Sequence, residues 1–257
     1  MHADPALIRS VKAHVSPGEW QVRTDLAAAY RAVAMHGWDD LVFTHLSARV
    51  PGANPHFLIN PYGMMFEEIT ASSLVKVDLQ GRKAMDSPFE INPAGFTIHG
   101  AVHEAREDAQ CVMHLHTMEG VAVSCQKAGL LALSQQSLFP LSSLAYHDYE
   151  GVALDPGEKV RLVADLGDKH ILILRNHGLL TCAQTVADAF LYMYILQKAC
   201  EVQVLAQAGG GELIAIPQAI VEGIRQASRV VLRQAGGMIA WPGILRKLDR
   251  LDPAWRD

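Results

Sequence analysis

The sequence predicts an α/β protein in which helices flank both faces of one mixed β-sheet. Three observations lead to this prediction. Segments with helical periodicity alternate with short apolar segments that are typical of strands. Some strand-like segments are joined by turns too short to hold a helix, which favours a mixed rather than a purely parallel sheet. Half of the 257 residues are hydrophobic and 19% are charged, which suits a chain that buries a sizeable core in a single domain.

The N-terminal half is expected to begin with an arm, residues 1–15, before a single domain over residues 16–257. Ser16-Pro17-Gly18-Glu19 has the form of a capping box with proline at the first helical position, so a helix should run from there to about His36. The next elements expected are strands at Leu46–Val50, Phe57–Asn60 and Val75–Asp78, a short helical turn at Thr70–Leu74, and a helix from Asn92-Pro93 through Arg106.

The C-terminal half continues the alternation of strands and helices. Its expected elements are a strand at Cys111–His116, helices at Met118–Lys127 and Asp155–Leu166, an apolar strand at His170–Arg175, a long helix from the Thr185 cap to Ala208, and a last helix at about Pro217–Gln234. A tail from about residue 236 carries alternating charges together with Trp241 and Trp255. This tail is expected either to pack on a neighbouring subunit or to lie on the surface of its own domain.

Charge and hydropathy narrow the classes of function. The net charge is −5 and the sequence has no basic cluster, so neither nucleic acid nor an anionic membrane surface is an expected partner. The N-terminus lacks the apolar segment of a signal peptide, and no apolar run approaches the roughly 18 residues of a membrane span. The four cysteines show no C-x-x-C spacing. A reduced, cytoplasmic protein is therefore expected.

The most informative stretch is Met113-His114-Leu115-His116-Thr117. Side chains alternate along a strand, so His114 and His116 should share one face, with their Cα atoms roughly 7 Å apart. Two imidazoles at that spacing can bind one ion. Taken alone, the pattern fits two structural histidines equally well.

A third histidine changes that balance. His177 follows the buried strand Ile171–Leu174, and Gly178 behind it should let the backbone turn. Open α/β sheets bind ligands beyond the carboxyl ends of their strands, so His177 is placed to join the other two. Three neutral imidazoles suit one divalent metal and leave coordination positions open. Zinc is the first expectation, with manganese, iron and cobalt as alternatives.

These motifs resemble the metal-binding core of the class II aldolase/adducin family. Met113–Thr117 and Leu174–Leu179 carry the resemblance, which covers about residues 23–210, and Ala145–Tyr149 and Ala199–Gln203 look closer to the adducin branch than to the phosphosugar aldolases. The resemblance implies a three-layer α/β/α fold with a central mixed, largely antiparallel sheet. It also implies a metal held by three histidines, and usually a homotetramer with the active site at the subunit interface.

The sequence departs from the phosphosugar aldolases of this family at two places. Their general acid/base Glu, four residues before the histidine matched by His99, is replaced by Gly95, and Glu90 is a poor substitute on spacing. Their phosphate-binding side chains are matched by His45, Tyr62, Pro93 and Ala94. Since proline and alanine side chains donate no hydrogen bond, an unphosphorylated small-molecule substrate is expected.

Four further residues are candidates for the site. His99 and Tyr146 are candidates for catalysis, His99 because it lies one turn beyond Gly95 and Tyr146 as a donor to a developing oxyanion. A buried structural histidine and a core tyrosine are the competing interpretations. His45 and Tyr62 are candidates for substrate binding, with His45 placed to contact a substrate carboxylate.

Three functions remain open from the sequence. The first is a divalent-metal-dependent lyase, of the retro-aldol or decarboxylase type, acting on a small hydroxy-carbonyl compound or keto acid through a metal-stabilised enediolate. The second is a non-enzymatic, adducin-like binding or assembly module, which Gly95 and the adducin-like motifs favour. The third is a non-heme iron oxygenase.

Overall fold

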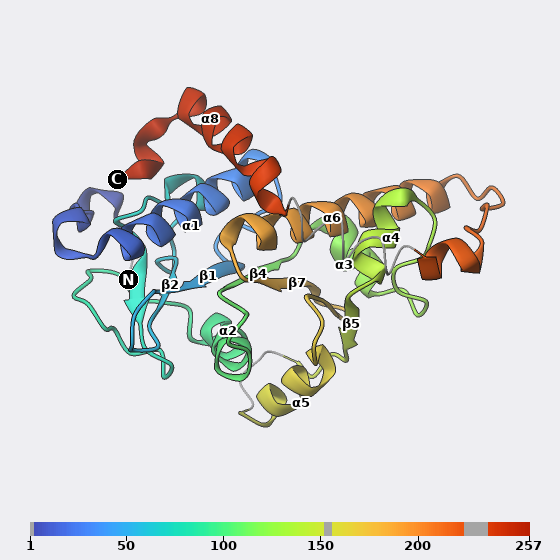
Figure 1. Ribbon diagram of the computed structural model, residues 1–257, viewed down its shortest axis with the longest axis horizontal. Helices are drawn as coiled ribbons and strands as arrows, with labels where there is room; N and C mark the ends of the chain where they lie inside the picture. Colours follow the sequence, from blue (N-terminus) through green and yellow to red (C-terminus); the bar gives the residue numbers. More distant parts are fainter. Residues whose placement is uncertain (1–2, 152–155, 224–235) are drawn as a thin grey trace.

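Seven strands form one mixed sheet, and helices cover both of its faces (Figure 1). The computed structural model describes residues 3–151, 156–223 and 236–257. The strands are β1 (His45–Arg49), β2 (Phe57–Ile59), β3 (Val75–Val77), β4 (Cys111–Leu115), β5 (Leu144–His147), β6 (Ile171–Leu174) and β7 (Gly178–Ala183). Their order is β3-β2-β1-β4-β7-β6-β5, and every neighbouring pair is antiparallel except β5 and β6. The prediction of a largely antiparallel mixed sheet is confirmed.

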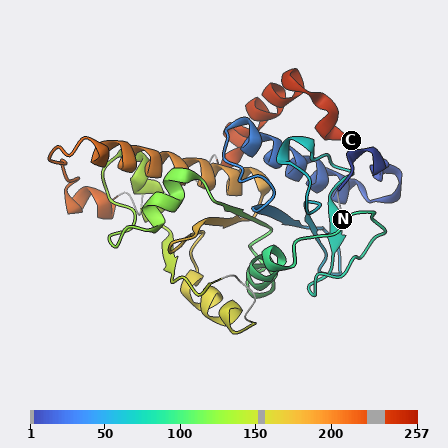
Figure 2. The ribbon, with the colours of Figure 1, turned by 180° about the vertical axis from the view of Figure 1, so that it is seen from behind.

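The helices lie in two layers on opposite sides of this sheet (Figures 1 and 2). One layer contains α1 (Pro17–Met35), α3 (Met118–Ser124), α4 (Gln135–Leu141) and α6 (Val186–Ala208). The other contains α2 (Pro93–Ala105) and α5 (Pro156–Leu166). Short 3-10 helices occur at Pro5–Leu7, Lys12–His14, Phe66–Glu68, Gly237–Ile239 and Pro253–Arg256. The three-layer α/β/α architecture is therefore present.

Strand β4 shows how the sequence divides between the two layers. Cys111, Met113 and Leu115 belong to the large hydrophobic cluster on the α1 and α6 side. Val112 belongs to the smaller cluster that includes side chains from α2 and α5. Because side chains alternate along a strand, His114 lies on the same side as Val112 and faces the α2 layer. Alternation alone thus places a histidine between the sheet and α2.

Helix α1 begins where the sequence predicts, although its cap differs in detail. The Ser16 Oγ atom accepts a hydrogen bond from the Glu19 backbone N–H at 3.1 Å, as a capping box requires. The Glu19 carboxylate does not return to Ser16 but forms ion pairs with Arg23 and Lys76, at 3.0 and 2.7 Å. The expected helical turn at Thr70–Leu74 is a hydrogen-bonded turn, in which Ser73 N donates to Thr70 O at 3.2 Å.

Several elements are missing from the sequence prediction. Strands β5 and β7 and helix α4 are among them, and β7 lies between β4 and β6 near the middle of the sheet. Strand β7 begins directly after His177, so nothing in the sequence separates it from the preceding turn. Helix α4 holds Pro140 in its interior, which argues against a helix on local grounds.

The C-terminal tail packs on its own domain. It forms helix α8 (Trp241–Leu251), which lies beside α1 (Figure 1). The Trp241 Nε1–H donates to the Asp25 carboxylate at 2.9 Å, and the Trp255 side chain is fully buried. Residues 218–223 of the expected last helix are helical, and residues 224–234 lie outside the described residues. None of the described helices is long and apolar enough to cross a membrane.

Candidate metal centre

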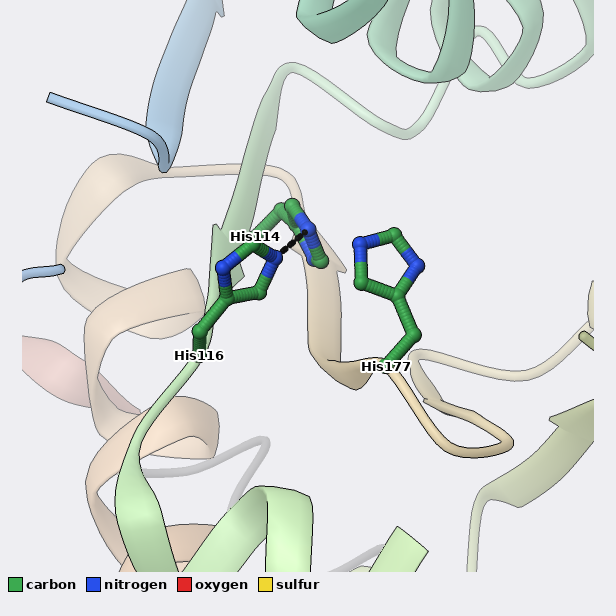
Figure 3. Close-up of side chains that lie close together, drawn as sticks. All are labelled: His114, His116 and His177. Carbon is green, nitrogen blue, oxygen red and sulfur yellow. Dashed lines mark hydrogen bonds between the residues drawn. The ribbon is translucent and has the colours of Figure 1, made fainter. Parts of the chain in front are cut away.

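Three histidine side chains converge where β4 ends beside the β6–β7 turn (Figure 3). The ligand nitrogens of His114, His116 and His177 lie within 4.8 Å of one another. The Nε2 atoms of His114 and His116 are 2.9 Å apart, and the His177 ring centroid lies 4.7 and 4.9 Å from the other two. The predicted set of three is therefore brought together in space.

The local backbone explains how His177 reaches the other two. His177 N donates to Leu174 O at 3.1 Å, which closes a tight turn between β6 and β7. Asn176, not Gly178, carries the left-handed backbone of this turn, with φ of 56°. Gly178 serves a different purpose, because a Cβ atom there would lie 2.5 Å from the Leu115 carbonyl oxygen. Glycine therefore lets β7 pass close to β4, and the expected reason for Gly178 is wrong.

Hydrogen bonds at the far ring nitrogens fix the orientation of two ligands. His114 Nδ1 is 3.0 Å from the Leu179 carbonyl oxygen, and His116 Nδ1 is 3.0 Å from an Asp40 carboxylate oxygen. Both partners can only accept, so both Nδ1 atoms carry the proton. In the neutral rings the two Nε2 atoms then face each other as lone pairs. This is the arrangement that a bound cation satisfies, with the carbonyl and the carboxylate as supporting partners.

Burial keeps His114 and His177 in the state that binds a metal. The pKa of His114 is well below its usual value because the ring is desolvated, and the neighbouring histidines lower it further. The same causes lower the pKa of His177 to about 4. Metal binding needs neutral imidazole, and both rings are neutral at pH 7. Three nitrogen ligands fit zinc or a similar divalent ion and leave positions open for a substrate.

A cavity of about 410 Å³ opens beside these three rings. The sequence prediction names His45 and Gly95 from its wall. Its other lining residues are Asp40, Phe43, Asn92, Ile98, Tyr149, Gly151 and Asn176. Asp40 could not be found from sequence spacing, because it lies 76 residues before the histidine that it orients. Loop acids without a periodic pattern give no such signal.

The predicted substrate and catalytic residues occupy different places. His45 lines the cavity, whereas His99 is fully buried behind it. The structure does not bring Tyr146 or Tyr62 into the cavity wall. The Tyr146 hydroxyl accepts a hydrogen bond from Leu130 N at 3.0 Å, and its ring packs 4.1 Å from the Arg175 guanidinium. These contacts match the core-tyrosine interpretation.

The position of the family's catalytic Glu is filled by a neighbouring ring. Gly95 is buried, and a Cβ atom on it would lie 2.9 Å from His45 Cγ and closer still to His45 Cδ2 and Nε2. The His45 imidazole thus fills the space that a side chain at position 95 would need. Glu90 does not compensate, because its exposed side chain pairs with Lys83 at 2.7 Å and does not line the cavity.

Fold and site together define a class of protein: a three-layer α/β/α domain with three histidines grouped as a candidate metal centre at the edge of a cavity. The sequence profile of the Class II Aldolase and Adducin N-terminal domain matches residues 24–204. A Pseudomonas aeruginosa protein, provisionally named a class 2 aldolase, is 63% identical over 259 residues, covering 100% of this chain and 98% of that protein. Alpha-adducin from Mus musculus is 48% identical over 198 residues, which cover 75% of this chain and 27% of alpha-adducin.

Solved structures agree with this assignment. An aldolase II superfamily protein from Pseudomonas syringae has a TM-score of 0.94 at 48% identity, covering 97% of this chain and 100% of that one. L-fuculose 1-phosphate aldolase from Glaciozyma antarctica PI12 has a TM-score of 0.78 at 28% identity, covering 98% and 99%. The chain belongs to the class II aldolase/adducin family.

Proposed function

We propose that this protein is a metal-dependent carbon–carbon lyase that acts on a small unphosphorylated hydroxy-carbonyl compound or keto acid. The observation that carries the proposal is the pair of imidazoles whose Nδ1 atoms are tied to Leu179 O and Asp40, leaving both Nε2 lone pairs directed at one point. An assembly module has no evident need for ring orientation of this kind. A lyase needs it because the ligands must hold a charged ion in a fixed place.

The chain's own residues divide the work as follows. His114, His116 and His177 would hold the ion, and Asp40 keeps the His116 ring in place. A divalent ion bound there supplies Lewis-acid polarisation of a carbonyl and stabilises the negative charge that develops as a carbon–carbon bond breaks. Asn92 and Asn176 line the same cavity and offer amide groups for binding substrate oxygens.

The charge of the cavity wall supports an unphosphorylated substrate. Among the described residues that line the cavity, none is a lysine or an arginine. A phosphate dianion is bound in proteins by several donors, usually including cationic ones. The wall instead contains the Asp40 carboxylate, so apart from the proposed ion no cation in the described lining would offset a phosphate dianion. This lack of cationic donors favours a neutral or singly charged substrate.

The oligomer that we propose is a homotetramer with the active site at a subunit interface. Four apolar side chains near the cavity mouth are strongly exposed: Leu41, Phe43, Met118 and Tyr149. Phe43 and Tyr149 line the cavity, and Met118 lies two residues from His116. A second copy of the chain would cover this rim. Light scattering at micromolar concentration should give about four times the 28.0 kDa of one chain, and a monomer would contradict the proposal.

A second candidate function is an adducin-like binding or assembly module. It is favoured by the 48% identity to alpha-adducin and by Gly95 in place of a catalytic carboxylate. Such a module needs the fold but not the metal. The two functions therefore differ in what the histidines should bind.

Metal analysis followed by a substrate screen separates the candidates. The protein is purified without added ions and its metal content measured. The metal-loaded protein is then tested on unphosphorylated hydroxyketones, hydroxyaldehydes and keto acids. Zinc or manganese with carbon–carbon cleavage would support the lyase. Iron with oxygen consumption would support an oxygenase instead. A protein that binds no metal would favour the adducin-like module and overturn the proposal.

A further inference from the structure

A second group of polar side chains lies directly behind the metal centre, between β1 and α2. It consists of His45 and Ser47 on β1 and His99 and His103 on α2. His45 and Ser47 are two apart on a strand and share a face, and His99 and His103 are one helical turn apart. All four side chains are buried, with at most 4% of each residue exposed. We call this group the buried chain.

The four side chains form one continuous series of hydrogen bonds. His45 Nδ1 lies 2.8 Å from His99 Nε2, and His99 Nδ1 lies 2.5 Å from Ser47 Oγ. Ser47 Oγ lies 2.7 Å from His103 Nε2. The series ends where His103 Nδ1 meets the Ala109 carbonyl oxygen at 2.7 Å. It runs from the cavity wall into the interior and stops at a group that can only accept.

Counting donors and acceptors fixes every proton in the chain. The Ala109 carbonyl accepts, so His103 Nδ1 carries a proton and its Nε2 must accept. The single Ser47 hydroxyl proton is used there, so His99 Nδ1 must donate to Ser47 and His99 Nε2 must accept. His45 Nδ1 then donates to His99. With neutral rings only one arrangement satisfies all four contacts, and it leaves His45 Nε2 without a proton.

The two rings deepest in the buried chain are held neutral by their surroundings. Desolvation lowers the pKa of His103 to about 3, and it holds the pKa of His99 well below its usual value. Among the described residues, His45 Nε2 has no hydrogen-bond partner, and this edge of the ring lies at the cavity wall beside Gly95. An unpaired acceptor in a cavity wall is left for a ligand or for water.

From this arrangement we infer that His45 is a specificity-determining residue that accepts a hydrogen bond from a substrate hydroxyl. The buried chain holds its ring in the Nδ1–H form, so the cavity presents a lone pair rather than a donor at this place. A hydroxyl fits that lone pair, whereas a phosphate or carboxylate oxygen is repelled by it, so a hydroxyl replaces the carboxylate that the sequence suggested as the partner of His45. Ser47, His99 and His103 are positioning residues that act through His45. The inference deepens the proposed function and rests on it for the substrate class.

The first test reads the protons directly and needs neither a substrate nor turnover. The ring nitrogens of ¹⁵N-histidine-labelled protein report by NMR which nitrogen of each ring is protonated. The expected result for the parent is a protonated Nδ1 and an unprotonated Nε2 at His45. In Ser47→Ala the series of hydrogen bonds is interrupted at position 47. His45 should then also populate the tautomer with its proton on Nε2. A parent protein with a proton on His45 Nε2 would overturn the inference, even if no variant folds.

The second test measures binding in the zinc-loaded protein. Calorimetry compares dihydroxyacetone, which offers a hydroxyl at each end, with dihydroxyacetone phosphate. The parent should favour the unphosphorylated compound. Ser47→Ala should shift the ratio of the two affinities toward the phosphate by about tenfold, which corresponds to one charge-assisted hydrogen bond. Ser47→Thr, which keeps the hydroxyl, should restore the parent ratio.

Ser137→Ala is the matched control, because Ser137 is also buried and its hydroxyl donates to the Ser134 carbonyl at 2.8 Å, in α4. Ser137→Ala should leave the ratio of the two affinities unchanged. If Ser47→Ala also left this ratio unchanged, the inference would be overturned. The two proposals fail separately. Expected tautomers and ratios without any lyase activity would reject the proposed function alone, whereas cleavage by a protein with His45 Nε2 protonated would reject the role of His45 alone.

Discussion

Two groups of three histidines lie against each other in this protein, and they differ in what their nitrogens contact. In the metal centre, two rings are each anchored at one nitrogen and direct the other at a shared point. In the buried chain, every ring nitrogen except His45 Nε2 is hydrogen-bonded, either to another member or to the Ala109 carbonyl oxygen. The two groups meet where the His45 and His114 rings are 5.3 Å apart. Both groups consist of histidines, so the hydrogen-bond partners of the ring nitrogens decide what each group can do.

The contrast has a simple physical basis. An imidazole whose second nitrogen is unpaired can bind a cation or a ligand, whereas one with both nitrogens paired is structural. His45 combines both properties, because its Nδ1 is bonded within the buried chain while its Nε2 is unpaired at the cavity wall. The same ring also excludes a side chain at position 95.

The largest expected effect concerns that exclusion. The metal-loaded parent should show no meaningful cleavage of fuculose 1-phosphate. Gly95→Glu alone should not produce cleavage either, because the new side chain cannot fit beside His45. In the double variant Gly95→Glu with His45→Ala the carboxylate has room, and a general acid/base contributes typically about 10²–10⁴-fold in rate. A coupled assay for the aldehyde product measures this. Robust cleavage by the parent would show that the departures from the aldolases have been misjudged.

Removing one ligand should separate the two groups most clearly. His116→Ala should weaken zinc binding by more than the roughly 10–100-fold that loss of a supporting residue costs. The fold should persist, because the core face of β4 is untouched. His103→Gln, in the buried chain, should leave zinc affinity unchanged. Competition with a chromophoric chelator measures both, and circular dichroism checks the fold. Parent-like affinity in His116→Ala would mean that the metal centre is wrongly placed.

A smaller effect is expected from the carboxylate that orients His116. Asp40→Ala should lower zinc affinity by about 10–100-fold, since the ring loses its anchor. Asp40→Asn keeps an oxygen acceptor and should lose less. The same chelator competition gives both values. If Asp40→Ala bound zinc like the parent, the orientation of His116 would have to come from elsewhere.

The smallest effect is on stability as the pH falls. His103 is neutral in the folded protein, with a pKa of about 3, whereas its pKa in the unfolded chain is near 6.5. Above pH 6.5 both states are neutral and nothing changes. Below it the unfolded chain takes up the proton, so the free energy of unfolding falls by about 1.4 kcal/mol per pH unit for each such histidine, down to the folded pKa.

Urea unfolding of zinc-free protein at pH 6.0, 5.5 and 5.0, at one protein concentration, tests this slope. His103→Gln removes one buried titrating group and should flatten the slope by about 1.4 kcal/mol per pH unit. Equal slopes in the parent and His103→Gln would show that His103 does not stay neutral in the fold.

The sequence by itself determined the features that depend on local periodicity. Alternation along a strand put His114 and His116 on one face, and cap residues set the start of α1 and α6. The position after the buried strand Ile171–Leu174 predicted that His177 joins His114 and His116, and the family motifs implied the layered fold. The metal stays a prediction. These signals are local, because each is written within a few consecutive residues.

Only the tertiary structure decided the rest. Strand β7 lies beside β4, the charged tail forms α8 against α1, and Tyr146 and Tyr62 lie outside the cavity wall. The tertiary structure also joins His45 to His99 across 54 residues and Asp40 to His116 across 76. The physical reason is that the direction of a hydrogen bond depends on the acceptor at its far end. The state of His45 is thus set by a backbone carbonyl at Ala109, which no local pattern connects to it.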